Sequence, residues 1–97
     1  MKKLFKAYIK VLLTHVNQYT GVAYKDDPTI MAWETGNELG GWMLNGGAPP
    51  AAWTLEIAAY IKSLAPNQLV SDGTDGLQDE SGNLENNGLN VAGVDMV

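Results

Sequence analysis

Asn37 and Glu38 are the residues whose types and position best fit a chemical role. They come just after residues 28–32, an apolar run that predicts a buried strand, and just before a Gly-rich segment. A Glu fixed at the end of a rigid strand can be kept protonated by its surroundings and can give that proton to a leaving oxygen. A neighbouring Asn can hydrogen-bond a substrate hydroxyl. The pair therefore predicts acid–base chemistry at a strand end, which in an α/β barrel is the catalytic rim.

Cleavage of a glycosidic bond by such an acid also requires a second carboxylate, and Glu34 is the nearest one in the sequence. Four residues of strand span roughly 13 Å at ~3.3 Å per residue. Retaining enzymes hold their two carboxylates about 5–5.5 Å apart and inverting enzymes about 6.5–9.5 Å apart. Glu34 is therefore expected to be structural, sharing the face of Glu38 and pointing into the barrel. Asp72 and Asp75 end the next predicted strand and could approach Glu38 laterally, although Asp-Gly pairs cap turns on their own; the turn role is favoured.

Aromatic residues near this rim could contact a sugar. Trp42 lies in the loop after Glu38, where its ring could stack on a sugar face or could pack the loop onto the barrel. We assign Trp42 as a candidate substrate-binding residue and keep the packing role as the alternative. Trp33 and Trp53 are predicted to be core residues, because the first alternates away from Glu38 and the second lies on a helical apolar stripe. His15 is predicted to be a surface or interface residue.

The first half of the sequence predicts a helix followed by a strand. Apolar residues recur at helical spacing over residues 4–16, and the helix is expected to end near residues 19–21 with Gly21 as its C-terminal cap. Pro28 disfavours helix at the residue before it and introduces a strand over about residues 29–37. A Gly-rich loop over residues 39–48 follows.

The second half repeats the alternation. Two prolines open a second helix, which residues 65–67 stop. Residues 68–72 predict a second strand, closed by a turn at residues 73–76. Residues 77–90 predict a long polar loop with one possible helical turn. Residues 91–97 predict the approach to a third strand.

Alternating helices and strands imply parallel strands joined by right-handed crossovers. The pattern alone allows a barrel or an open doubly wound sheet, and neither a GxGxxG nor a Walker A motif favours a nucleotide-binding sheet. A complete (β/α)₈ barrel takes roughly 250 residues. If the barrel interpretation is correct, these 97 residues are a fragment with about three strands.

Composition narrows the possible partners. The net charge is −5 and there is no Arg, which argues against nucleic-acid binding and suits a neutral partner such as a sugar. There is no Cys, and a single His cannot form a zinc cluster. The acids at residues 79, 80 and 85 lack the spacing of a calcium loop. No cofactor or metal is expected, no run has the length of a membrane span, and Lys6 and Lys10 interrupt what would be a signal sequence.

Residues 24–38 closely resemble glycoside hydrolase family 5, and within it the endo-β-1,4-mannanase branch. Residues 20–21, 49–54, 61–64 and 72–76 match the same branch in the same order. The resemblance implies an α/β fold that is part of a (β/α)₈ TIM barrel, from about its third helix through the start of its sixth strand. Residues 1–97 would then be a fragment of a single catalytic domain, which needs the remainder of the barrel to fold.

The resemblance also implies a reaction. Glu38 would be the general acid/base of a retaining hydrolase of β-1,4-mannosidic bonds, Asn37 would bind near the sugar 2-hydroxyl, and the nucleophile would lie on a later strand outside this chain. The substrate would be mannan or a related β-1,4-glycan, without a cofactor and outside the cell. After Asn-Glu many family members have Pro and many mannanases have Arg, whereas this chain has Leu39. That departure leaves the choice between endo and exo action open. An exo-β-mannosidase or a β-1,4-glucanase of the same family is one alternative, and a non-catalytic fragment is another.

Overall fold

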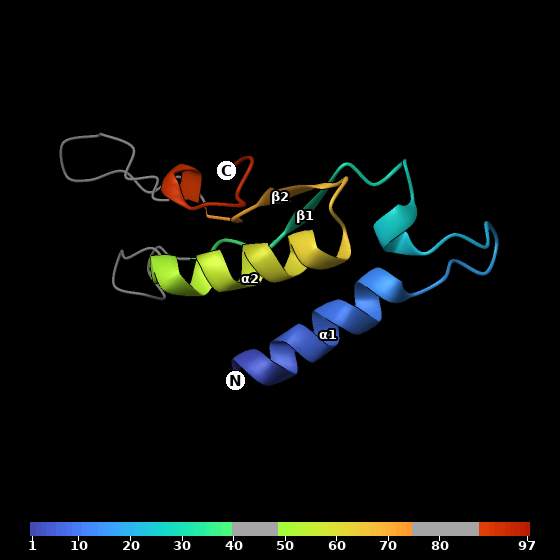
Figure 1. Ribbon diagram of the computed structural model, residues 1–97, viewed down its shortest axis with the longest axis horizontal. Coiled ribbons are helices and arrows are strands. Elements are labelled where there is room, and N and C mark those ends of the chain that lie inside the picture. Colours follow the sequence, from blue (N-terminus) through green and yellow to red (C-terminus); the bar gives the residue numbers. More distant parts are fainter. Residues whose placement is uncertain (40–48, 75–87) are drawn as a thin grey trace.

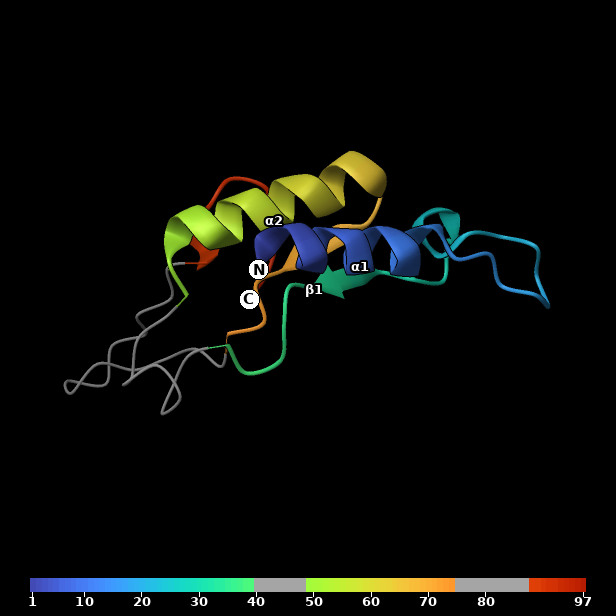
Figure 2. The same ribbon diagram turned by 90° about the horizontal axis from the view of Figure 1, so that it is seen from below.

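The computed structural model describes residues 1–39, 49–74 and 88–97. Its elements in chain order are α1 (Lys2–Thr14), the 3₁₀ helix η1 (Tyr24–Asp26), β1 (Ala32–Glu34), α2 (Ala51–Leu64), β2 (Leu69–Ser71) and the 3₁₀ helix η3 (Gly88–Asn90). The two long helices lie side by side along the short strands (Figures 1 and 2). The predicted alternation of helices and strands is confirmed. None of the described helices combines the length and apolar character needed to cross a membrane.

β1 and β2 form a parallel pair connected through α2. Ala32 pairs with Leu69 and Glu34 with Ser71. On the other edge of β2, Met96 forms a parallel bridge with Ser71. The predicted third strand therefore begins to pair near the end of residues 91–97, and β2 lies between two parallel neighbours.

The core lies between the two helices and the helix-facing side of the strands. Its buried members are Ile9, Leu13, Ile57, Ala58, Ile61, Ala65 and Val70. Trp33 and Trp53 are partly buried and pack against this cluster, so the predicted core role of both residues is confirmed. The stripe of α2 that was predicted from helical spacing supplies Ile57 and Ile61, both almost completely buried.

Charged residues also join the two helices. Lys2 and Lys6 of α1 both pair with the carboxylate of Glu56 on α2, and the Nζ of Lys6 lies 2.7 Å from its Oε1. Two hydrogen bonds lower the pKa of Glu56 from 4.5 to about 2. The bond from Lys2 has the larger effect and the bond from Lys6 the second largest. The lysines at the start of α1 therefore contribute to helix packing.

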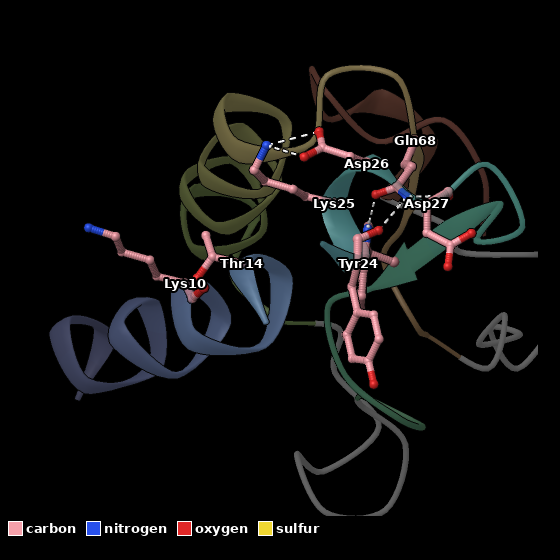
Figure 3. Close-up of polar contacts among 8 residues, drawn as sticks. Lys10, Thr14, Tyr24, Lys25, Asp26, Asp27 and Gln68 are labelled. Atoms are coloured by element: carbon pink, nitrogen blue, oxygen red, sulfur yellow. Dashed lines mark hydrogen bonds and ion pairs between the residues drawn. The ribbon is translucent and has the colours of Figure 1, made fainter. Parts of the chain in front are cut away.

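The amino ends of the strands are held by the side chain of Gln68, which is 5% exposed. Its amide nitrogen donates to the carbonyl oxygens of Tyr24 (2.9 Å) and Asp27 (3.1 Å), as Figure 3 shows. Its amide oxygen accepts a hydrogen bond from the indole nitrogen of Trp33 at 2.6 Å. One side chain thus joins η1, β1 and the start of β2.

The end of the first helix was predicted wrongly. α1 ends at Thr14, and Val16 then forms an antiparallel bridge with Ala23. Gly21 has a φ of +71° and lies in the turn between them, where its N–H donates to the carbonyl of Asn17. The helix stops early because backbone groups of this segment pair across the turn, and Gly21 serves that turn instead of capping the helix.

The first strand is shorter than the predicted range 29–37. The carboxylate of Asp27 accepts hydrogen bonds from the N–H and hydroxyl of Thr29, which forms a turn before the strand. A strand extends only as far as its partner pairs with it, and β1 pairs with the three residues of β2. The second strand is therefore also shorter than its predicted range of residues 68–72. The helical turn expected within residues 77–90 is found at η3. Trp42 and the acids at residues 75, 79, 80 and 85 lie outside the described residues.

Candidate active site

Asn37 and Glu38 lie just beyond the carboxyl end of β1, and both side chains are exposed. Glu38 has a φ of +51°, a left-handed backbone conformation that is uncommon for residues other than glycine. The pair therefore belongs to a tight turn that follows the strand. The alternation of β1 does not extend to Glu38, so the prediction that Glu34 and Glu38 share a strand face is wrong.

This turn, residues 35–39, is tied at both ends to the last residue of β2 and the two residues that follow it. At its start, the N–H of Thr35 donates to the carbonyl of Ser71 (3.0 Å), and the hydroxyl of Thr35 donates to the carbonyl of Asp72 (2.6 Å). At its end, the N–H of Leu39 donates to the carbonyl of Gly73 (3.0 Å). Asn37 and Glu38 lie between these attachment points.

Two glycines allow the turn to approach its neighbour this closely. Gly73 has a φ of +68°, and a Cβ at this position would overlap the carbonyl oxygen of Gly36 and lie 2.9 Å from the Cγ of Glu34. A Cβ on Gly36 would lie 2.6 Å from a methyl carbon of Leu39. The backbones of the two strand ends therefore touch directly, with no room for a side chain between them.

Asp72 performs the turn role that the sequence favoured. Its carboxylate is buried and accepts hydrogen bonds from the N–H (3.1 Å) and the hydroxyl of Thr74. Its Oδ2 also lies against Gly88, where an added Cβ would overlap it. These contacts turn the carboxylate into its own loop, so Asp72 stabilises the turn that follows β2.

Glu34 lies on the face of the sheet opposite the helices, because its neighbour Trp33 packs against the core. In a barrel that face is the interior, as the sequence predicted. Among the described residues no segment covers that face at Glu34, and its side chain is exposed. A carboxylate in this position is covered only when other strands close the sheet.

A mostly apolar cavity of about 670 Å³ lies beside the turn. Thr35, Gly36 and Leu39 line one side, and Phe5 of α1 and Trp53 of α2 line the other. A second cavity, of about 690 Å³, lies at the amino ends of the strands and is lined by Lys25, Asp27, Gln68 and their neighbours. Because catalytic groups of parallel barrels gather at the carboxyl ends, the first cavity is the one that borders the candidate site.

Sequence reasoning identified Asn37 and Glu38 but did not find the residues that hold them. Thr35, Leu39 and Gly73 do this through backbone hydrogen bonds and through the hydroxyl of Thr35. The sequence signal that could have pointed to these contacts was the glycine after each strand, Gly36 after β1 and Gly73 after β2. Among the described residues, no group of three or more His, Asp or Glu side chains could hold a metal ion.

Known proteins are similar to this chain in sequence and in fold. The family model described as GH family 5 beta-mannosidase-like matches residues 1–88. Mannan endo-1,4-beta-mannosidase 4 of Oryza sativa subsp. japonica is 45% identical over 94 residues, which cover 97% of this chain and 20% of that protein. The chain thus spans about a fifth of the length of this curated relative.

Two solved structures contain a segment whose fold is similar to that of this chain. The endo-beta-1,4-mannanase from Thermotoga petrophila matches with a TM-score of 0.71 and 46% identity, over 81% of this chain and 17% of that one. A glycoside hydrolase family 5 mannosidase from Rhizomucor miehei, solved as a mutant in complex with mannosyl-fructose, matches with a TM-score of 0.69 and 37% identity, over 84% and 18%.

Proposed function

Because this chain belongs to the β-mannosidase-like group of glycoside hydrolase family 5, we propose that the protein containing it hydrolyses β-1,4-mannosidic bonds in mannan. The observation that carries this proposal is the turn after β1. It presents the carboxylate of Glu38 at the carboxyl end of a parallel strand, beside Asn37, in a backbone conformation fixed by the neighbouring strand end. This is the location at which barrel enzymes place their catalytic groups.

In this mechanism Glu38 is the general acid and then the general base. Its proton passes to the glycosidic oxygen as the bond to the sugar breaks, and a carboxylate from another strand forms a covalent bond to the anomeric carbon. Glu38 then removes a proton from the water that hydrolyses this intermediate. Two inversions at the anomeric carbon give net retention. Asn37 donates a hydrogen bond to a sugar hydroxyl and orients the ring.

The wider architecture belongs to the same proposal. Residues 1–97 would supply the third helix through the start of the sixth strand of a (β/α)₈ barrel, and other parts of the protein would supply the nucleophile. Trp42 would bind the substrate by stacking on a sugar face. Secretion is part of the proposal as well, supported by the family resemblance alone.

A second candidate is an exo-acting mannosidase. It is favoured by the similarity to the Rhizomucor miehei mannosidase in complex with mannosyl-fructose. Endo and exo action differ in the size of fragment released: an endo enzyme shortens mannan to mixed oligosaccharides, whereas an exo enzyme releases single sugars. Product analysis on mannan, with cellulose as the comparison for a glucanase, distinguishes these activities.

The test of the proposal is Glu38→Gln in the full-length protein, with Glu34→Gln as the matched control. Gln keeps the shape of the side chain but cannot donate the proton, and general acid catalysis contributes on the order of 10²–10⁴-fold. We expect kcat/KM on mannan to fall by about that factor in Glu38→Gln, with a much smaller loss on an activated aryl mannoside, whose leaving group needs little protonation. Glu34→Gln should stay within a few-fold of wild type. Near-wild-type hydrolysis of mannan by Glu38→Gln would refute the assignment.

A further inference from the structure

The position of Glu38 is not fixed by its own side chain. Neither Glu38 nor Asn37 makes a side-chain hydrogen bond or ion pair to another described residue. The φ of +51° at Glu38 is one that an L-residue rarely adopts without support from its surroundings. Something outside the residue must therefore hold this backbone conformation.

Among the described residues, the hydrogen bonds that support this turn all come from residues 71–73. Thr35 and Leu39 bracket the turn, and their donors all reach carbonyl groups of residues 71–73. The hydroxyl of Thr35 is the only side-chain group in this set. Thr35 is 2% exposed, so water does not compete readily for its hydrogen bond to the carbonyl of Asp72.

Leu39 adds a contact that depends on its N–H and on its side chain. The N–H donates to Gly73, which a proline could not do. The side chain folds back over Gly36 and lines the apolar cavity together with Phe5 and Trp53. The residue directly after Glu38 is therefore attached to the neighbouring strand end by its N–H, and its side chain faces a cavity that the helices line on the other side.

We propose that Thr35, Leu39 and Gly73 are positioning residues that fix the carboxyl group of Glu38 for proton transfer. We refer to these three residues as the rim clamp. The proposal rests on the proposed function, since it assigns the acid role to Glu38. A general acid must lie within hydrogen-bond reach of the oxygen that it protonates, and a displacement of about 1 Å can cost on the order of 10²-fold in rate. Loosening the clamp should therefore impair protonation specifically.

The sharpest test is Thr35→Val in the full-length protein, because Val has the same shape and lacks only the hydroxyl. Thr35→Ser restores that hydroxyl. Thr29→Val is the matched control, since it removes a threonine hydroxyl that bonds to Asp27 at the opposite end of β1. The readout is kcat/KM on mannan and on an activated aryl mannoside, whose ratio reports the need for the acid.

We expect Thr35→Val to lower kcat/KM on mannan by about tenfold or more and on the aryl mannoside by less than about threefold. Thr35→Ser should recover most of the loss, and Thr29→Val should leave the ratio unchanged. A purely structural role would lower both activities equally, through the fraction of folded enzyme. An unchanged ratio in Thr35→Val would therefore overturn the inference.

Amide hydrogen exchange provides a second readout that does not depend on activity. The N–H of Leu39 should exchange faster in Thr35→Val than in wild type or in Thr29→Val. If the wild-type protein hydrolyses no glycan, the proposed function fails, and the exchange rate of Leu39 still shows whether the clamp exists. Unchanged protection of Leu39 would refute the clamp itself, even in an active enzyme.

Discussion

Replacement of Gly73 by alanine tests how tightly the two strand ends are packed, and Gly21→Ala provides a matched control. The two glycines have nearly the same backbone conformation, with φ of +68° and +71°. Their surroundings differ. A Cβ on Gly73 would overlap the carbonyl oxygen of Gly36, whereas a Cβ on Gly21 would have no atom within 4 Å. The difference between the two variants therefore isolates the steric contact.

The magnitudes follow from these two contributions. Left-handed backbone costs an L-residue roughly 1–2 kcal/mol, and alanine recovers about 0.4–1 kcal/mol by restricting the unfolded chain. Gly21→Ala should therefore lower the free energy of unfolding by about 1 kcal/mol. Gly73→Ala carries the same cost plus about 1–3 kcal/mol for forcing an atom into packed backbone. We expect a total of roughly 2–4 kcal/mol for Gly73→Ala.

Urea unfolding of the full-length protein, followed by tryptophan fluorescence, measures both values. Because the displaced group is the carbonyl of Gly36, two residues from Glu38, Gly73→Ala should also reduce hydrolysis of mannan by the protein that remains folded. Gly21→Ala should not. Equal losses of stability in the two variants would refute the close approach of the strand ends, that is, the direct packing of Gly73 against the carbonyl of Gly36.

Four further predictions follow from other contacts. Gln68→Leu keeps the side-chain volume but strands the indole N–H of Trp33 and two carbonyls, and should lower the free energy of unfolding by about 2–4 kcal/mol in urea; a loss below about 0.5 kcal/mol would contradict this. The lowered pKa of Glu56 means that its ion pairs stabilise the fold above pH 4.5 and are lost as the pH falls towards about 2; Glu56→Gln should flatten the acid limb of a stability–pH curve. A peptide of residues 1–97 should melt without cooperativity and release no sugar from mannan, because α1 leaves apolar residues such as Leu4 (78% exposed) uncovered; sharp unfolding of a monomer would refute this. Proton NMR of the first product of mannan hydrolysis should show the β-anomer, and an initial α-anomer would reject retention.

The helices and strands could be predicted where the pattern of residues within one segment is enough to specify them. Helical spacing of apolar residues identified both long helices, and Trp53 was placed correctly because the helical period assigns a face directly. Trp33 also lies against the core, although the alternation with Glu38 from which its place was inferred does not hold. The boundaries were not predictable in the same way. α1 ends at Thr14 because Val16 pairs with Ala23 across a turn. β1 is short because its length depends on pairing with β2, whose residues lie 37 positions later in the sequence than their partners. Pairing between segments leaves no periodic signal in either one.

The candidate site shows the same division. Asn37 and Glu38 could be identified from residue type and from their place after an apolar run. The clamp could not, since the hydroxyl of Thr35 bonds to a residue 37 positions later. Only the glycines after the strands were visible, and glycine at a strand end fits many roles. Their function became clear only when the structure showed which backbone groups they let meet.

The two ends of the strand pair are held by different means, and this bears on how Glu38 is positioned. At the amino end, the buried amide of Gln68 ties Trp33 of β1 to the start of β2. At the carboxyl end, backbone groups of Thr35 and Leu39 meet those of residues 71–73. A slip of one residue between the strands would move the core residues to the opposite face and break both sets of contacts. The register chosen at the amino end therefore determines which carbonyls the turn can reach, so a perturbation at Gln68 should affect proton transfer by Glu38 although the two residues lie at opposite ends of the sheet.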